Sequence, residues 1–298
     1  MFRTLRQSGL LVCVLVVLGL AGCSPAAAPS DKLQVTVSVA PQQYFVERIG
    51  GEHVEVNVMV PTGRDPHSYE PKPDQLRALS ASVAYFSIGV TFEKAWLDKI
   101  VSVNPRMALV DTTRGIERMP GAHQHEEGGG LDADEELDEH IWTSPELVKI
   151  QAQTIAAALV KLDPEHGQVY GANLKTFQAD IDVLEADIRD ALEGVQTRKF
   201  MVFHPAWGYF ARDFGLEQIS VEVGGQEPSA QELANLIREA KAEGIQVIFA
   251  QPEFSAQAAE TIAAEIGGKV LLISPLAPDW LDNMRRVVVA FSEVMGKE

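Results

Sequence analysis

Cysteine is almost absent from this chain of 298 residues, which has only two, at positions 13 and 23. Two cysteines so close to the N-terminus cannot supply a disulfide framework for the fold. Basic residues are also scarce, with 25 lysines and arginines against 42 acidic residues and a formal charge of −17. This balance disfavours nucleic acid as a partner, because phosphate contacts need basic patches. Long hydrophobic runs are lacking too, since the apolar stretch from Gly9 to Leu20 is too short to span a membrane well.

The first 22 residues resemble a secretory signal peptide. Two arginines precede the apolar run, which ends in LAGC at residues 20–23, similar to the lipobox of bacterial lipoproteins. The resemblance implies cleavage before Cys23, a lipid on its sulfur and a flexible tether over residues 23–31. An ordinary signal with an incidental cysteine is the alternative. Cleavage would shift the formal charge from −17 to −19 and leave about 270 residues to fold around a hydrophobic core alone.

Strand-like runs alternate with helical patterns along the rest of the chain, which predicts an α/β fold with mainly parallel sheets. Strands are expected at residues 33–40, 54–60, 83–88, 107–111, 199–203, 216–223, 245–250 and 269–273. Helices are expected at residues 41–50, 73–80, 92–101, 145–162, 206–214, 229–242, 256–266 and 280–295. The two groups of strands indicate two lobes, although no sequence repeat relates them.

One further helical pattern, over residues 164–193, is longer than a typical globular helix. It contains no internal proline, and apolar residues recur at helical spacing from Phe177 to Leu192. We therefore expect a rigid connecting helix within residues 163–197. It would join an N-terminal lobe at residues 32–162 to a C-terminal lobe at residues 198–298.

An acidic segment at residues 121–139 interrupts the N-terminal lobe (GAHQHEEGGGLDADEELDE). It has few apolar residues and three consecutive glycines, so it should be mobile and unable to contribute to a core. It also holds His123 and His125 among its carboxylates. The segment is either a solvated loop or a low-affinity collector of cations near a binding site.

Three other histidines, His67, His140 and His204, lie where a strand-like run ends or a helix begins. In open α/β sheets, ligands bind beyond the carboxyl ends of the strands. Two of these histidines belong to the first lobe and one to the second, so they could meet in the cleft between the lobes and surround one metal ion. From the pattern alone, a metal site and three ordinary hydrogen-bonded histidines are equally good interpretations.

The sequences around these histidines resemble a known family. DPHSYEPKPDQ (65–75), EHIWTSPELV (139–148) and FHPAWGYFARDFGLEQI (203–219) are similar to motifs of the ZnuA-like, or cluster A-I, substrate-binding proteins of bacterial zinc and manganese ABC importers. The similarity continues through GGQEPSAQEL, GIQVIFAQPEFS and SPLAPDWLDNM, and so covers nearly the whole mature chain. It implies two α/β lobes bridged by a long rigid helix, with the metal site in the interlobe cleft.

The resemblance also implies the ligands. His67, His140 and His204 match the family's metal-binding positions, and histidine at the third position favours Zn²⁺ over Mn²⁺, which prefers more oxygen ligands. Many members place an aspartate ligand where this chain has Ser274. The fourth ligand therefore stays open between water, a carboxylate of the acidic segment and Glu253.

Two carboxylates beside the first motif, Asp65 and Glu70, are expected to orient its loop rather than to bind metal. The resemblance implies that the protein is an extracytoplasmic lipoprotein, anchored to the membrane and monomeric, and that it is not an enzyme. It would capture Zn²⁺ and pass it to the permease and ATPase of an ABC importer. The alternatives are a manganese receptor, an adhesin-like member of the family, and a three-histidine zinc hydrolase or hydratase. Against the enzyme, the sequence has no HExxH-like pair, evident general base or nucleophile motif.

Overall fold

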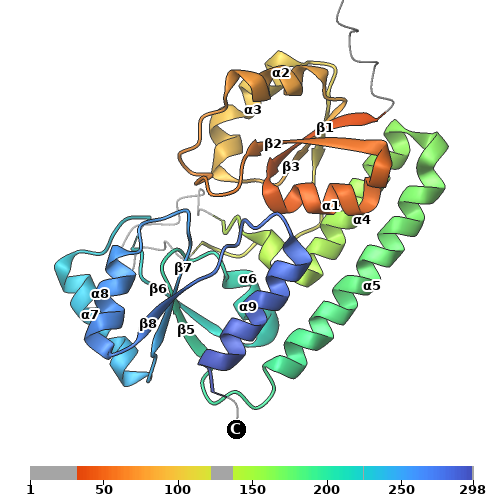
Figure 1. Cartoon of the computed structure of the whole chain (residues 1–298). Coiled ribbons are helices and arrows are strands. Elements are labelled where there is room, and N and C mark those ends of the chain that lie inside the picture. The colour runs from red at the N-terminus through yellow and green to blue at the C-terminus, as the bar shows by residue number, and fades with distance from the viewer. Residues whose placement is uncertain (1–31, 122–136, 224, 297–298) are drawn as a thin grey trace, which may run out of the picture. The chain divides into compact units, whose positions relative to one another are not determined.

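Two four-stranded parallel sheets form the framework of the protein (Figure 1). The computed structural model describes residues 32–121, 137–223 and 225–296. The first sheet has the order β2-β1-β3-β4 and the second the order β6-β5-β7-β8, so the two lobes share one topology that the sequence does not reveal. The strands are β1 (Leu33–Val39), β2 (Val54–Val60), β3 (Ala84–Ser87), β4 (Ala108–Asp111), β5 (Lys199–Val202), β6 (Glu217–Ser220), β7 (Val247–Ala250) and β8 (Lys269–Leu272).

Helices connect the strands in the alternating order that the sequence predicts. They are α1 (Ala40–Gly50), α2 (Pro73–Ala81), α3 (Thr91–Val103), α4 (Pro145–Leu162), α5 (Gly167–Ala191), α6 (Gly208–Phe214), α7 (Ala230–Ala242), α8 (Gln257–Ile266) and α9 (Trp280–Val294). Short 3₁₀ turns precede β2, α4 and α5; the one before α4 is η2 (Ile141–Thr143). Each expected helix and strand is present, with ends displaced by no more than three residues.

Strand β1 is buried on both of its faces over most of its length. Val35 and Val37 are fully buried, and so is Thr36 on the opposite face. The Thr36 hydroxyl is 2.7 Å from the hydroxyl of Ser82, which satisfies a polar group that the covering layer would otherwise leave unpaired. Burial on both faces is the usual condition of a parallel sheet.

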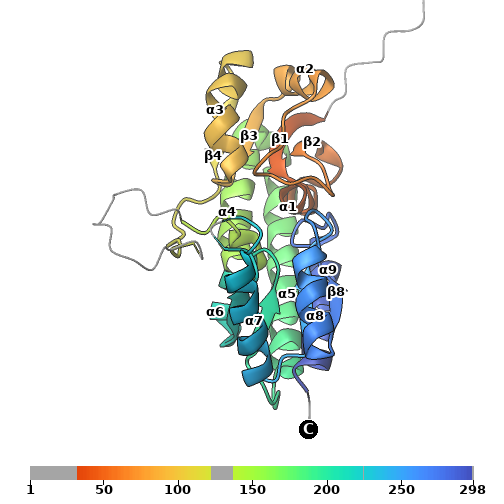
Figure 2. The same cartoon turned by 90° about the vertical axis from the view of Figure 1, so that its left-hand side faces the viewer.

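The long helix α5 runs alongside both lobes (Figures 1 and 2). Its 25 residues place Tyr170, Phe177, Ile181, Leu184 and Ile188 on one buried stripe, with the spacing of a helix packed on a core. It contacts α1 and α4 of the first lobe and α9 of the second. The predicted connecting helix is thus confirmed, and it is anchored along its length.

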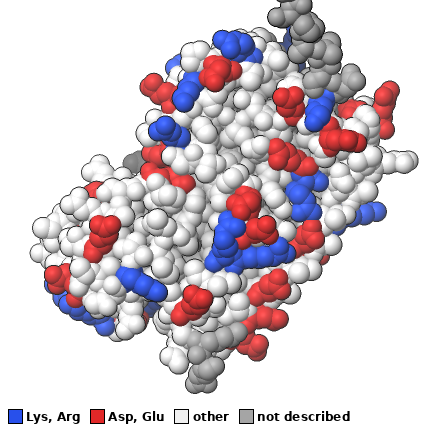
Figure 3. Space-filling view, viewed as in Figure 1, with Lys and Arg blue, Asp and Glu red and all other residues white. Residues whose placement is uncertain are grey.

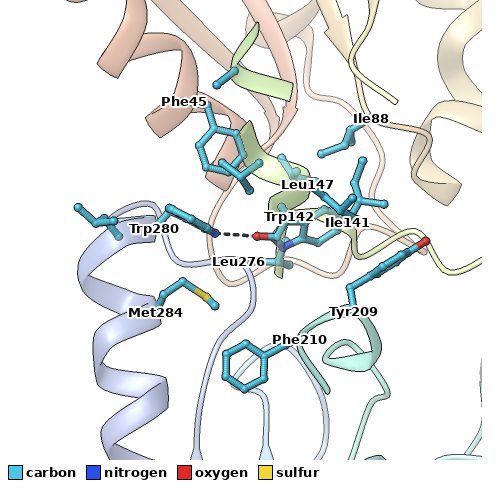
Figure 4. Packing of buried hydrophobic residues seen from close by; sticks show 14 of the residues in the cluster. Phe45, Ile88, Ile141, Trp142, Leu147, Tyr209, Phe210, Leu276, Trp280 and Met284 are labelled. Carbon is cyan, nitrogen blue, oxygen red and sulfur yellow. Dashed lines mark hydrogen bonds between the residues drawn. The ribbon is translucent and has the colours of Figure 1, made fainter. Parts of the chain in front are cut away.

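One cluster of buried side chains runs through both lobes, from Val35 to Met295. Figure 4 shows its central part, where the indole N–H of Trp280 donates to the carbonyl of Trp142, at 2.7 Å. The indole N–H of Trp142 in turn donates to the carbonyl of Pro275, at 2.8 Å. Exposing one such large apolar side chain costs about 1.5–3 kcal/mol. Movement of the lobes as separate bodies would expose several of them, so this junction holds the lobes in one arrangement.

Charge on the surface is mixed. On the face in Figure 3, acidic and basic side chains lie beside one another with uncharged surface between the groups. Some charged groups also join helices: the ammonium of Lys149 on α4 lies 2.6 Å from Asp182 and 2.7 Å from Glu185, both on α5. Among the described residues, no helix is both long and apolar enough to cross a bilayer.

Candidate metal site

The first histidine of the site lies on the loop that follows β2. The carboxylate of Asp65 accepts a hydrogen bond from the backbone N–H of His67, at 2.8 Å, and another from the hydroxyl of Ser68, at 2.7 Å. This Asx-type turn fixes the backbone of the loop, so Asp65 has the orienting role expected of it. The His67 side chain remains 34% exposed, more than either of the other two histidines.

The second histidine precedes the turn η2 and is held by its neighbour two residues earlier. One oxygen of Asp138, Oδ1, accepts from the backbone N–H of His140, at 2.9 Å, and lies 2.8 Å from the ring atom Nδ1. The carbonyl of Asp138 accepts from Arg118, at 3.0 Å, and from the hydroxyl of Tyr209, at 2.9 Å. A Cβ at Gly208 would meet the Asp138 carboxylate at 2.8 Å, so this close approach requires glycine.

The third histidine follows β5 directly and is nearly buried, at 4% exposure. Its backbone N–H and carbonyl pair with the side-chain amide of Gln251, at 3.1 and 2.7 Å. Its Nδ1 lies 2.6 Å from Oε2 of Glu222, and the ring stacks on Phe254 with centroids 4.6 Å apart. The backbone and the ring of His204 are therefore both fixed.

These three side chains converge. Each of His67, His140 and His204 offers one ring nitrogen, and the three atoms lie within 4.8 Å of one another. The Nε2 atoms of His140 and His204 are 3.2 Å apart. Two nitrogens bound to one tetrahedral zinc ion at 2.0–2.1 Å would be about 3.3 Å apart. The recess beside them is lined by residues of both lobes, including Pro66, Trp142 and Leu276.

The protonation of these rings favours a metal. Because Nδ1 of His140 faces Asp138 and Nδ1 of His204 faces Glu222, each ring can hold its proton on Nδ1 and present the lone pair of Nε2 to an ion. Burial lowers the pKa of His204 below its ordinary value, and the nearby His140 adds to this, although Glu222 opposes it. At His140, burial acts in the same direction, but the hydrogen bond and charge of Asp138 outweigh it and raise the pKa.

The carboxylate first considered as a fourth ligand, Glu253, is engaged elsewhere. Its Oε1 accepts from the hydroxyl of Ser274, at 2.8 Å, and that hydroxyl also accepts from the backbone N–H of Leu276, at 3.1 Å. Burial raises the pKa of Glu253. Among the described residues, the converging group contains the three histidines and no carboxylate. Ser274, at the family's aspartate position, thus anchors its own loop.

A different carboxylate, Glu139, lies beside the site; it belongs to the acidic segment whose carboxylates were considered as a fourth ligand, although the sequence did not single it out. Its Oε1 is 3.7 Å from Nε2 of His67, and its Oε2 accepts from the backbone N–H and the hydroxyl of Thr91, at 2.6 and 2.9 Å. The sequence signals were its place in that segment and its position next to His140.

The predicted acidic segment, residues 121–139, extends too far at its C-terminal end. Asp138 and Glu139 are 8% and 7% exposed, because Arg118, Tyr209 and Thr91 hold them against the fold. His123 and His125, the predicted accessory residues, and Cys23 lie outside the described residues.

Known proteins resemble this chain over most of its length. The chain matches the family model described as zinc-uptake complex component A, periplasmic, over residues 35–294. It is 28% identical to the high-affinity zinc uptake system protein ZnuA of Bacillus subtilis (strain 168) over 284 residues, which cover 91% of this chain and 89% of that protein. A crystal structure of ZnuA is 47% identical, with a TM-score of 0.84, and covers 89% of this chain and 100% of its own. A zinc-bound deletion mutant of ZnuA is 46% identical, with a TM-score of 0.83 and coverage of 90% and 100%.

Proposed function

Because this chain belongs to the ZnuA family of periplasmic zinc-uptake components, we propose that it is an extracytoplasmic receptor that binds Zn²⁺ and delivers it to an ABC importer. The observation that carries the proposal is the convergence of three ring nitrogens within 4.8 Å. His67, His140 and His204 are the proposed ligands, and zinc is the cargo of the protein. The family consists of binding proteins, and the chain is not an enzyme.

The chemistry of the site favours zinc over manganese. Imidazole nitrogens suit Zn²⁺, whereas Mn²⁺ prefers a coordination sphere richer in carboxylate and water oxygens. The spacing of the Nε2 atoms of His140 and His204, 3.2 Å, fits a tetrahedral ion. The carboxylates of Asp138 and Glu222 support the ligands from behind, as partners of metal-bound histidines commonly do.

The proposed partners are the membrane permease and the ATPase of the importer. The proposed anchor is a lipid on Cys23, followed by the tether at residues 23–31, with the receptor acting as a monomer. For the segment that holds His123 and His125, outside the described residues, we keep the proposal of weak accessory cation binding.

Calorimetric titration of the mature domain with Zn²⁺ tests this function. We expect one tight site in the wild type, and its loss when His67, His140 and His204 are all replaced by alanine. His53 and His166 provide a matched control, because they form a stacked pair with centroids 3.8 Å apart that is separate from the converging group. The double replacement of these two by alanine should leave the tight site intact.

Deletion of residues 122–136 should remove only weak additional binding. The deletion must spare Asp138 and Glu139, which contact the site. Tight zinc binding that survives the triple replacement would refute the proposed site. Stronger binding of Mn²⁺ than of Zn²⁺ at the same pH would refute the proposed cargo.

A further inference from the structure

The structure contains an unexplained polar atom beside the proposed zinc ligands. Oε1 of Glu139 is buried and has no hydrogen-bond partner among the residues that the structure describes. The side chain is only 9% exposed, so water does not readily take the place of a partner. An unpaired buried carboxylate oxygen is costly, and a native protein that keeps one usually has a use for it.

The carboxylate is also held in one orientation. Its other oxygen, Oε2, accepts two hydrogen bonds from Thr91, the first residue of helix α3, at 2.6 and 2.9 Å. These bonds fix the plane of the group and leave Oε1 directed at His67, whose Nε2 is 3.7 Å away. Two ligand atoms of one tetrahedral zinc ion are about 3.3 Å apart. The separation observed without an ion is longer by about 0.4 Å, which a small movement of the more exposed His67 ring would remove.

We propose that Oε1 of Glu139 is the fourth protein ligand of the bound ion, so that the site is three histidines and one carboxylate. The inference rests on the proposed function, because it needs the ion to bind at His67, His140 and His204. Glu139 directly precedes His140 in the chain. A single segment, held by Arg118 and Thr91, would therefore supply two adjacent ligands.

A carboxylate ligand has a defined electrostatic role here. Three neutral imidazoles leave the full divalent charge of zinc in a largely buried site, and Glu139 would reduce it by one unit directly at the ion. Glu253 also has one buried oxygen, Oε2, without a partner in the described part of the chain. Neither glutamate belongs to the group of three histidines. Oε1 of Glu253 is bound to Ser274, whereas the unpaired oxygen of Glu139 lies 3.7 Å from Nε2 of His67. The two glutamates are therefore a natural pair for comparison.

The direct experiment is a crystal structure of the wild-type protein with Zn²⁺. The proposal expects Oε1 of Glu139 about 2.0–2.2 Å from the ion. It is overturned if the ion is bound by the three imidazoles and a water, with the carboxylate outside bonding distance. It is equally overturned if Glu253 occupies the fourth position.

Two matched variants give a readout in solution. Glu139→Gln keeps the shape and can still accept both hydrogen bonds from Thr91 through its amide oxygen, so the apo protein should fold as the wild type does. We expect at least about a tenfold loss of zinc affinity, whereas Glu253→Gln should change it less than about twofold. Equal effects of the two replacements would count against the assignment.

The visible spectrum of the Co²⁺ form separates a ligand from a residue that acts through another group. Loss of Glu139 as a ligand should admit water and shift four-coordinate Co²⁺ toward five coordination, with weaker d–d absorption. An unchanged spectrum in Glu139→Gln would overturn the proposal. Failure of the wild type to bind Zn²⁺ at all would instead refute the proposed function.

Discussion

The carboxylate behind His204 offers the sharpest test of how the site is built. Glu222 has its Oε2 2.6 Å from Nδ1 of His204, on the opposite side of the ring from the atom that faces His140. It should therefore hold the imidazole in the tautomer that binds metal and place a negative charge behind it. The replacement Glu222→Gln keeps the size of the side chain and removes the charge.

The expected size of the effect follows from the geometry. A zinc ion on Nε2 of His204 would lie about 6.5 Å from the Glu222 carboxylate, and at an effective dielectric constant of 20 the attraction is about 5 kcal/mol. This is an upper bound, because the ligands share the charge of the ion and the surroundings relax. Replacing such supporting groups typically lowers metal affinity about 10–100-fold, or about 1.4–2.7 kcal/mol. We expect Glu222→Gln to fall in this range.

Competition by protons cannot account for that loss. Burial lowers the pKa of His204, while its hydrogen bond to Glu222 acts in the opposite direction. Without the carboxylate the pKa should fall further, so the ring stays neutral near pH 7.5 and a further rise in pH should not restore the affinity.

Competition between the protein and a zinc-chelating dye measures the affinity of both forms. Glu217→Gln is the control, because Glu217 lies on β6, which ends shortly before Glu222, but is 61% exposed and pairs with Lys199. An unchanged affinity in Glu222→Gln, or an equal loss in Glu217→Gln, would refute the reasoning.

Three further predictions concern stability and pH. Ser144→Ala should lower the free energy of unfolding by about 0.5–2 kcal/mol in a denaturant titration, because the hydroxyl accepts the N–H of Leu147 at the start of α4. As the pH is lowered from about 8 to about 5, the zinc affinity measured by calorimetry should already begin to fall before the pH reaches 6.5. The reason is that Asp138, although burial opposes it, raises the pKa of His140 above 6.5, and zinc needs the neutral ring. Burial raises the pKa of Glu93 from 4.5 to about 7, so its neutral form is favoured in the fold and stability is lost as pH rises through that interval. The unfolding free energy of the wild type relative to Glu93→Gln should therefore fall by about 3 kcal/mol between about pH 4 and about pH 8.

The sequence was sufficient for the fold because local pattern and tertiary structure agree in this chain. Residues 54–60 alternate valine with other residues as a strand does, and Ser144-Pro145-Glu146 begins a helix with a cap, a proline and an acid. The order of the strands within each sheet could not be predicted from the sequence. That order depends on which crossovers are made, and the two lobes use the same one without any sequence repeat.

Some residues of the site could be predicted from the sequence and others could not. His67, His140 and His204 could be identified from the motifs around them, and the structure brings their rings together. Asp138 and Glu139 could not be separated from the other carboxylates of an acidic run by composition. They differ from these through contacts with residues distant in sequence, notably Arg118, Tyr209 and Thr91. Their burial is a tertiary property that no local pattern contains.

The contacts of the three histidines also limit how an ion can enter and leave. His140 and His204 are each fixed by a carboxylate on Nδ1, and Trp142, two residues beyond His140, is tied to Pro275 of the other lobe. The shared core opposes separation of the lobes, so these two rings form a fixed half of the site. His67 is the most exposed of the three and lies on the loop after β2, where an Asx turn shapes its backbone. An ion released from this site therefore has its least costly path through displacement of the His67 loop, since that movement leaves the shared core buried.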